Sequence, residues 1–142
     1  MELGINYIAI LIAGVANFFV GFLWYTVLFG KIWAKEMGIP MDAKPTPAAM
    51  IKSLVMNFIG CFLLAFVFAH NNAAWSFVPG MDQMGTAGKM ANAVGFTWLG
   101  FYLLVDLNTV AFENRSWKLF FINTTYHFTM LLVSALILFN WK

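Results

Sequence analysis

The segment from Ile5 to Phe29 contains no charged side chain, and this run is the strongest constraint on the fold. A helix crosses the roughly 30 Å hydrocarbon core of a bilayer in about 20 residues, so the segment is long enough to span it. It is also much longer than the apolar part of a cleaved signal peptide, which reaches about 15 residues. We therefore expect a retained transmembrane helix.

The composition of the chain agrees with this interpretation. Hydrophobic residues make up 62% of the 142 residues and charged residues make up 10%. Soluble domains average about 50% hydrophobic and about 25% charged residues. Because so few polar side chains cannot cover a soluble core, we expect lipid to be the main solvent. The net charge of +2 is too small to indicate a nucleic-acid partner.

Three more apolar segments follow the first. Thr46 and Pro47 are typical of a helix N-cap followed by proline at the first helical position, and Ser116 can cap the last helix. We expect one all-α domain over residues 1–142, a four-transmembrane-helix bundle with spans at about 5–29, 47–70, 89–112 and 117–141. The turn before Ser116 is short, so the third and fourth spans should form an antiparallel hairpin.

The cations lie mainly on one side of this arrangement. The first and third loops hold six of the eight Lys and Arg residues, namely Lys31, Lys35, Lys44, Lys52, Arg115 and Lys118. Only Lys89 and Lys142 fall on the opposite side. Because cytoplasmic loops are enriched in Lys and Arg, we expect loops 1–2 and 3–4 in the cytoplasm and both termini outside.

Small residues recur at spacings of four or eight in the first two spans. Helices in a membrane associate through such small side chains and through buried polar contacts. We expect helix packing through these positions, which are Ala13, Asn17 and Gly21 in the first span and Ser53, Cys61 and Ala65 in the second.

Polar side chains are predicted to cluster near the cytoplasmic boundary. At about 1.5 Å per residue, several of them fall at a similar depth on all four spans. They are Trp24, Tyr25, Asn57, Asp106, Asn123 and His127. A central aspartate costs about 2.5–3.5 kcal/mol to insert, so Asp106 needs a partner. His127 is the expected partner, with Asn57 and Asn123 as neutral donors.

The residues leave two interpretations of this cluster open. A buried Asp–His pair can relay protons, or it can be an interhelical hydrogen bond that sets the register of two helices. Asn108 points roughly opposite Asp106 and predicts a second protein contact. We therefore expect a homo-oligomer or docking to another membrane subunit, in addition to the lipid bilayer.

The turn between the third and fourth spans carries four further candidate residues, Glu113, Arg115, Trp117 and Lys118. Their charged side chains can form a salt-bridged clasp, meet headgroups and water, or bind a cytosolic partner.

Catalytic and cofactor chemistry have little support. Cys61 is the single cysteine, and His70 and His127 are predicted at different depths, so they cannot clamp one haem. The sequence shows no ligand spacing typical of metal sites and no nucleophile motif. We therefore expect no enzyme activity and no cofactor. Two roles stay open, a path for an ion or small solute and an accessory subunit of a larger complex, with a lipid-interface enzyme as a remote third.

Two segments resemble a known family. GFLWYTVLFGKIWAKEMG, residues 21–38, and FENRSWKLFFINTTYHF, residues 112–128, are similar to the signatures of a bacterial family catalogued as domain of unknown function 1761. Residues 41–90 carry little of the likeness, and Asp106 and His127 lie outside the positions that carry it. The resemblance implies a small multi-pass protein of the bacterial inner membrane, without naming an activity. The matching positions are Trp24, Tyr25, Phe29, Gly30, Lys31, Trp33, Glu113, Arg115, Trp117, Lys118 and Asn123.

Overall fold

The computed structural model describes residues 4–141, and this part of the chain folds into helices without strands. Four of the helical segments are long and apolar enough to cross a membrane: Tyr7–Leu28, Pro47–Trp75, Thr86–Ala111 and Trp117–Asn140. Each begins and ends within a few residues of a predicted span. The prediction of an all-α chain with four helices of membrane-spanning length is confirmed.

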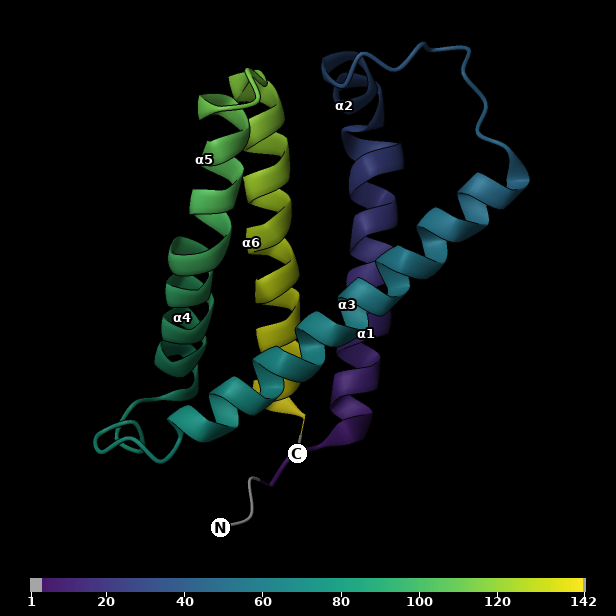
Figure 1. Ribbon diagram of the computed structural model, residues 1–142. Coiled ribbons are helices and arrows are strands. Elements are labelled where there is room, and N and C mark those ends of the chain that lie inside the picture. The colour runs from purple at the N-terminus through teal and green to yellow at the C-terminus, as the bar shows by residue number, and fades with distance from the viewer. Residues whose placement is uncertain (1–3, 142) are drawn as a thin grey trace.

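The helices follow one another along the chain and differ in length (Figure 1). The first span joins α1, Tyr7–Phe22, to a π-helical segment, Leu23–Leu28, and α2, Gly30–Glu36, follows it. The second span is α3, Pro47–Trp75. The third span consists of α4, Thr86–Thr97, a π-helical segment, Trp98–Tyr102, and α5, Leu103–Ala111, and the fourth is α6, Trp117–Asn140.

Side-chain caps explain where three of the long helices begin. The Asn6 side chain accepts a hydrogen bond from the Ala9 amide before α1. Thr46 caps α3 with Pro47 at the first helical position, and Ser116 caps α6. Each cap satisfies an amide that has no partner inside its helix. The two caps predicted from the sequence, Thr46 and Ser116, are confirmed.

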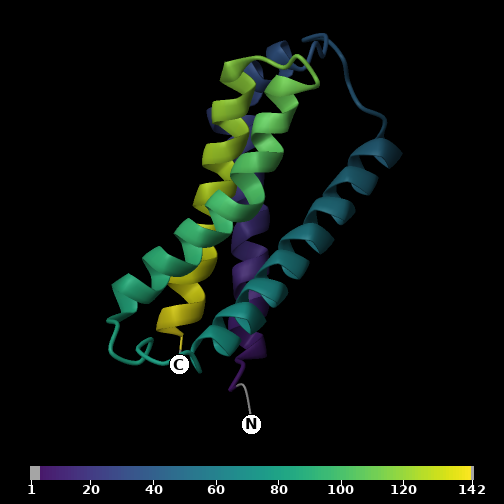
Figure 2. The ribbon, with the colours of Figure 1, turned by 60° about the vertical axis from the view of Figure 1, so that its left-hand side comes forward.

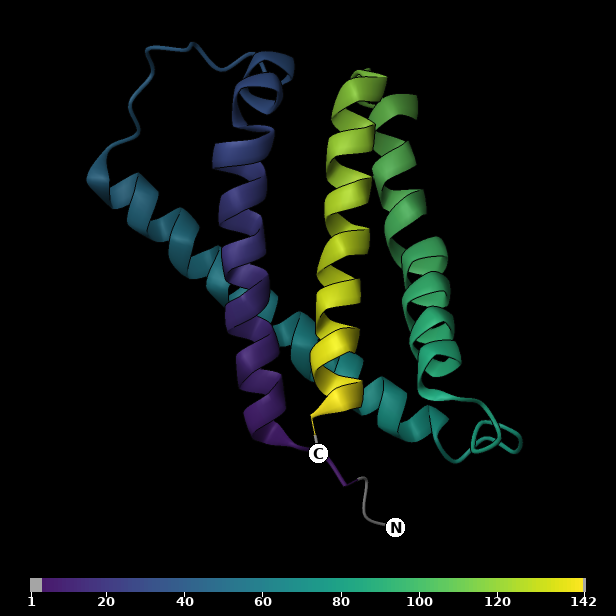
Figure 3. The ribbon, with the colours of Figure 1, turned by 180° about the vertical axis from the view of Figure 1, so that it is seen from behind.

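α6 is the hub of the fold. It packs against α1 on one side and against α4 and α5 on another, and it also contacts α2 and α3. Figures 1 and 3 show α1 and α6 running side by side, with α3 crossing them diagonally. Figure 2 shows that the turn between α5 and α6 and the segment after α1 lie at one end, and both termini at the other.

The first half of α3 diverges from the other helices. Residues 47–60 are all exposed, and burial begins at Cys61. At about 1.5 Å per residue, the 29 residues of α3 reach about 43 Å, which exceeds a bilayer core and favours a tilt. Ser53 is therefore exposed and does not share the buried packing of Cys61 and Ala65, because the tilt carries it away from α1, and helix packing at Ser53 stays a prediction.

The remaining small residues pack where α1 crosses α3 and α6. Ala13, Asn17, Gly21, Cys61 and Ala65 are all buried, as predicted. The α1 and α3 backbones come close together beside these residues, because a Cβ atom added at Gly14 would lie 3.2 Å from the Phe62 Cα atom. Small side chains thus let the α1 and α3 backbones come together.

Replacing Gly14 with leucine should weaken the α1–α3 crossing, because the added atoms would meet the Phe62 backbone. Overpacking of this kind costs about 1–3 kcal/mol. The thermal midpoint of the purified protein in detergent measures the effect. Gly60→Leu is the matched control, since a Cβ at Gly60 has no neighbour within 4 Å. Equal midpoints for the two variants would show that this crossing does not limit stability.

Candidate functional site

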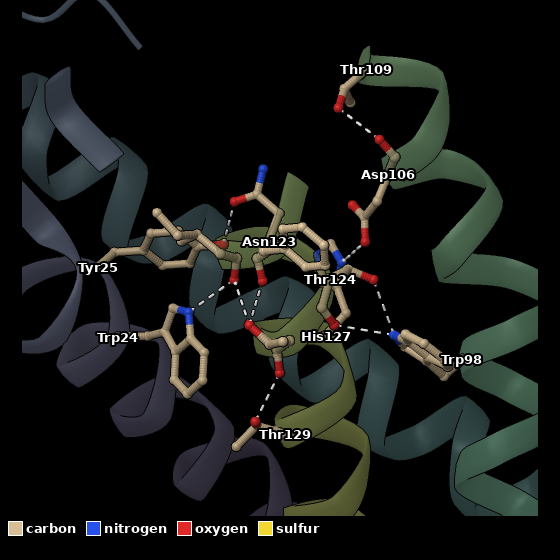
Figure 4. Close-up of polar contacts among 12 residues, drawn as sticks. Trp24, Tyr25, Trp98, Asp106, Thr109, Asn123, Thr124, His127 and Thr129 are labelled. Atoms are coloured by element: carbon tan, nitrogen blue, oxygen red, sulfur yellow. Dashed lines mark hydrogen bonds and ion pairs between the residues drawn. The ribbon is translucent and has the colours of Figure 1, made fainter. Parts of the chain in front are cut away.

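An aspartate–histidine pair joins α5 to α6 (Figure 4). The Asp106 Oδ2 atom lies 2.8 Å from the His127 Nδ1 atom. The Asp106 side chain is 5% exposed and the His127 side chain is 23% exposed. The predicted pairing of these two residues is confirmed, and both lie in segments of membrane-spanning length.

The π-helical turn before α5 helps to aim Asp106 at α6. In a regular α-helix, a step of four residues drifts about 40° around the axis, so positions four apart leave one face. A π turn holds more residues and reduces this drift. Val94, Trp98, Tyr102 and Asp106, each four residues apart, all face α6: Val94 belongs to a core cluster with α6 residues, and the other three contact α6 side chains.

Aromatic rings enclose the pair. The Tyr102 ring centroid lies 4.6 Å from the His127 ring, and the Tyr126 ring centroid lies 5.5 Å from it. Because the Asp106 side chain is buried, it depends on His127 for its hydrogen bond. With Asp106 ionised, the Nδ1 atom carries the shared proton whether the imidazole is neutral or charged. The second ring nitrogen, Nε2, makes no hydrogen bond to the described residues.

A second polar group lies between the first span and α6. The Tyr25 hydroxyl donates to the Asn123 side-chain oxygen at 2.9 Å, and the Trp24 indole donates to the Ile122 carbonyl at 3.0 Å. Figure 4 shows this group and the Asp106–His127 pair on different sides of α6. Tyr126 stands between them, since its ring centroid is 5.0 Å from that of Tyr25.

Asn57 is placed differently from the prediction. It is exposed on α3, and its side-chain oxygen accepts from the Cys61 thiol at 3.8 Å. It makes no hydrogen bond to Asp106, because this part of α3 tilts away from α5. The expectation that all four spans contribute to one hydrogen-bonded layer is therefore wrong for α3.

Two buried contacts of α6 were not predicted from the sequence. The Trp98 indole donates to both oxygens of Thr124, the carbonyl at 3.1 Å and the hydroxyl at 3.2 Å. Asn17 donates to the Ser134 hydroxyl at 2.8 Å, and the Asn17 carbonyl oxygen is buried without a partner among the described residues. The sequence signal for the second was that both spans carry a polar residue on their predicted inner face.

The charged turn forms at most a loose clasp. Arg115 lies 4.0 Å from Glu113, and both side chains are more than a third exposed, so solvent screens the pair. Trp117 and Lys118 are exposed, and Lys118 has no ion-pair partner within the described residues. Lys118 instead borders a shallow surface depression with Lys31 and Lys35.

A groove of about 900 Å³ runs beside the pair. Its walls come from the second half of α3 and from the third span, and α6 contributes His127 and Leu131. The lining is mostly apolar, with Phe66, Phe68 and Phe101 among its residues. Within residues 4–141, no three His, Cys, Asp or Glu side chains lie close enough to hold a metal ion.

Comparisons with known proteins identify the family of this chain. No curated protein and no solved structure gives a significant match. The model of one family, described as a protein of unknown function (DUF1761), matches residues 8–139, which is nearly the whole chain. The likeness seen in the two end segments therefore extends through the middle as well. The chain belongs to the DUF1761 family.

Proposed function

We propose that the protein provides a path for an ion or small solute across a membrane, with the Asp106–His127 pair as its proton-binding element. The 2.8 Å contact between these side chains, within two apolar helices of membrane-spanning length, carries the proposal. An ionisable residue inside a membrane span is costly, and such residues mark ion pathways and proton relays. The proposal is for a non-catalytic protein.

A structural link alone does not account for the charge of this pair. The Trp98–Thr124 contact already ties the third span to α6 through neutral groups. Buried ion pairs add little stability over apolar residues, because desolvation offsets their attraction. The His127 side chain is partly exposed and the Asp106 side chain is buried behind it, so the imidazole is the member of the pair that a solute can reach.

The proposed path follows the α3 side of α6. The Trp24 indole and the Tyr25 hydroxyl both donate to α6, to the Ile122 carbonyl and the Asn123 side-chain oxygen, so these donors are already engaged. His127 borders the open groove between α3 and the third span, and its Nε2 atom is unengaged by the described residues. We therefore place the moving proton or solute at His127 and give the other residues a supporting role.

Assembly with a second subunit is the other function that an observation favours. The exposed half of α3 carries Ser53, and Asn108 is exposed on α5. Polar side chains on helices in lipid face other protein rather than acyl chains. We propose that a second copy of the chain, or another membrane subunit, covers this half of α3.

We further propose a bacterial inner-membrane location with loops 1–2 and 3–4 in the cytoplasm. Lys31, Lys35, Lys44 and Arg115 lie in these loops or in the short helix α2 that leads into the first of them. An excess of cations favours the cytoplasmic side. Lys142, counted for the opposite side, lies outside the described residues.

Changing Asp106 to asparagine should abolish proton movement, because the amide cannot balance a protonated His127. Proteoliposomes with an internal pH dye and an imposed potential measure the flux. Glu113→Gln is the control, since it removes a carboxylate from the same hairpin at an exposed position. Flux that survives in Asp106→Asn, or that wild-type vesicles share with empty ones, would contradict the proposed path.

The variant Ser53→Cys should form a disulfide-linked dimer in membranes if a second copy of the chain covers α3. The experiment uses a Cys61→Ser background, oxidation in the membrane and gel analysis. Val55→Cys is the control, because Val55 lies on the opposite side of the same exposed helix. Equal dimer yields at both positions would indicate random collisions instead of a defined interface.

Single cysteines should report the orientation. In intact cells, a membrane-impermeant maleimide should label Asp82→Cys and leave Lys44→Cys unlabelled, both on the Cys61→Ser background, because Lys44 lies in the first loop and Asp82 in the second. Labelling in the reverse pattern would invert the proposed topology.

A further inference from the structure

The groove beside the Asp106–His127 pair is a candidate binding site in its own right. Its volume of about 900 Å³ lies within the range of small-molecule sites. Such sites combine apolar walls with a few placed polar groups. Here the polar groups at the α6 end are the His127 imidazole and the Tyr102 ring that stacks beside it.

The pair determines which hydrogen bonds a ligand can make. Because Asp106 accepts from Nδ1, the Nε2 atom of neutral His127 is an acceptor, and protonation turns it into a donor. A group that alternates between a hydroxyl and a carbonyl would match both states. A quinol hydroxyl can donate to neutral His127, and a quinone carbonyl can accept from protonated His127.

The surroundings disfavour a charged ligand. Apart from His127 and His70, the residues that line the groove carry no ionisable charge at neutral pH, and His70 bonds to the Phe66 carbonyl through Nδ1. The only other polar side chains in the lining with hydrogen-bonding groups are neutral, such as Asn71 and Thr97, so a charged headgroup would lose its hydration here without gaining a fixed counter-charge. An anion would also meet the Asp106 carboxylate behind the imidazole. A neutral headgroup is therefore favoured.

The shape of the groove suits a flat ring with an apolar tail. Phe66, Phe68, Phe101 and Tyr102 supply aromatic surface for ring contacts. The groove is open, and Val67, Phe101 and Val105 on its border are more than half exposed. In a bilayer a tail can leave through this opening into the lipid.

From these observations we propose that the groove binds an isoprenoid quinone or its quinol, with the ring beside Tyr102 and His127 and the tail leaving past Val105. The proposal uses the same pair as the proposed function but does not require proton flux. Quinone binding can therefore be observed in a protein that shows no proton flux, and proton flux can be observed without quinone binding.

Binding of a short-chain benzoquinone with a decyl tail to the purified protein in lipid nanodiscs tests the proposal, read as saturable quenching of tryptophan fluorescence. Decylbenzene, which has the ring and tail without the carbonyls, competes for apolar binding alone. We expect saturable quinone binding that decylbenzene does not displace. His127→Gln should weaken it about tenfold, as expected for the loss of a hydrogen bond to a chargeable group.

A matched pair of variants keeps the test independent of His127. Val105 and Leu104 are neighbours on α5 and are equally exposed, at 60% and 59%, but only Val105 lines the groove. Val105→Phe should weaken quinone binding several-fold, and Leu104→Phe should leave it unchanged.

Three results would overturn the proposal. Displacement by decylbenzene would mean that the groove holds an acyl chain only. Equal binding by Val105→Phe and Leu104→Phe would place the quinone elsewhere. Loss of oligomers in Val105→Phe, together with no quinone binding in the wild type, would mean that a second copy fills the groove.

Discussion

Polar side chains that lie away from water must find hydrogen-bond partners within the protein, and this requirement holds the fold together. In this chain the partners are found on α6. Several α6 side chains bond to other spans, among them Asn123 to Tyr25, Thr124 to Trp98, His127 to Asp106, and Ser134 to Asn17. Lipid offers these groups no partner, so leaving one unpaired costs more than in water. The contacts therefore fix the rotation of α6 against the first and third spans, and with it the position of the Asp106–His127 pair.

α3 is held by a different kind of contact. Its described side-chain hydrogen bonds are local, such as those from His70 to the Phe66 carbonyl and from Asn72 to the Phe68 carbonyl. It meets α1 through apolar packing around Gly14 and Ala65. Apolar packing in a membrane has no hydrophobic driving force behind it and tolerates displacement better than a hydrogen-bonded contact. The groove at His127 thus borders a helix that is held by apolar packing on α1, without side-chain hydrogen bonds to another span among the described residues.

The central part of the site could be predicted because one residue carried a large energetic demand. Asp106 needed a partner within an apolar helix, and His127 was the titratable group at the right depth. Asn57 was misplaced because equal depth was taken to mean contact, whereas α3 tilts away from the others. Trp98 was missed, since an aromatic residue in a membrane span resembles a packing residue until its polar atom and neighbours are known.

The sequence by itself determined the number of long helices, their caps at Thr46 and Ser116, and the pairing of Asp106. These follow from local hydropathy, local hydrogen bonding and the cost of a buried charge, which need no knowledge of neighbours. Only the tertiary structure decided the tilt of α3. It also decided the two π-helical segments, which determine the directions in which the Trp24 and Asp106 side chains point. Both depend on contacts between helices distant in sequence, because a wide turn or a tilt is stable only when neighbouring side chains hold it in place.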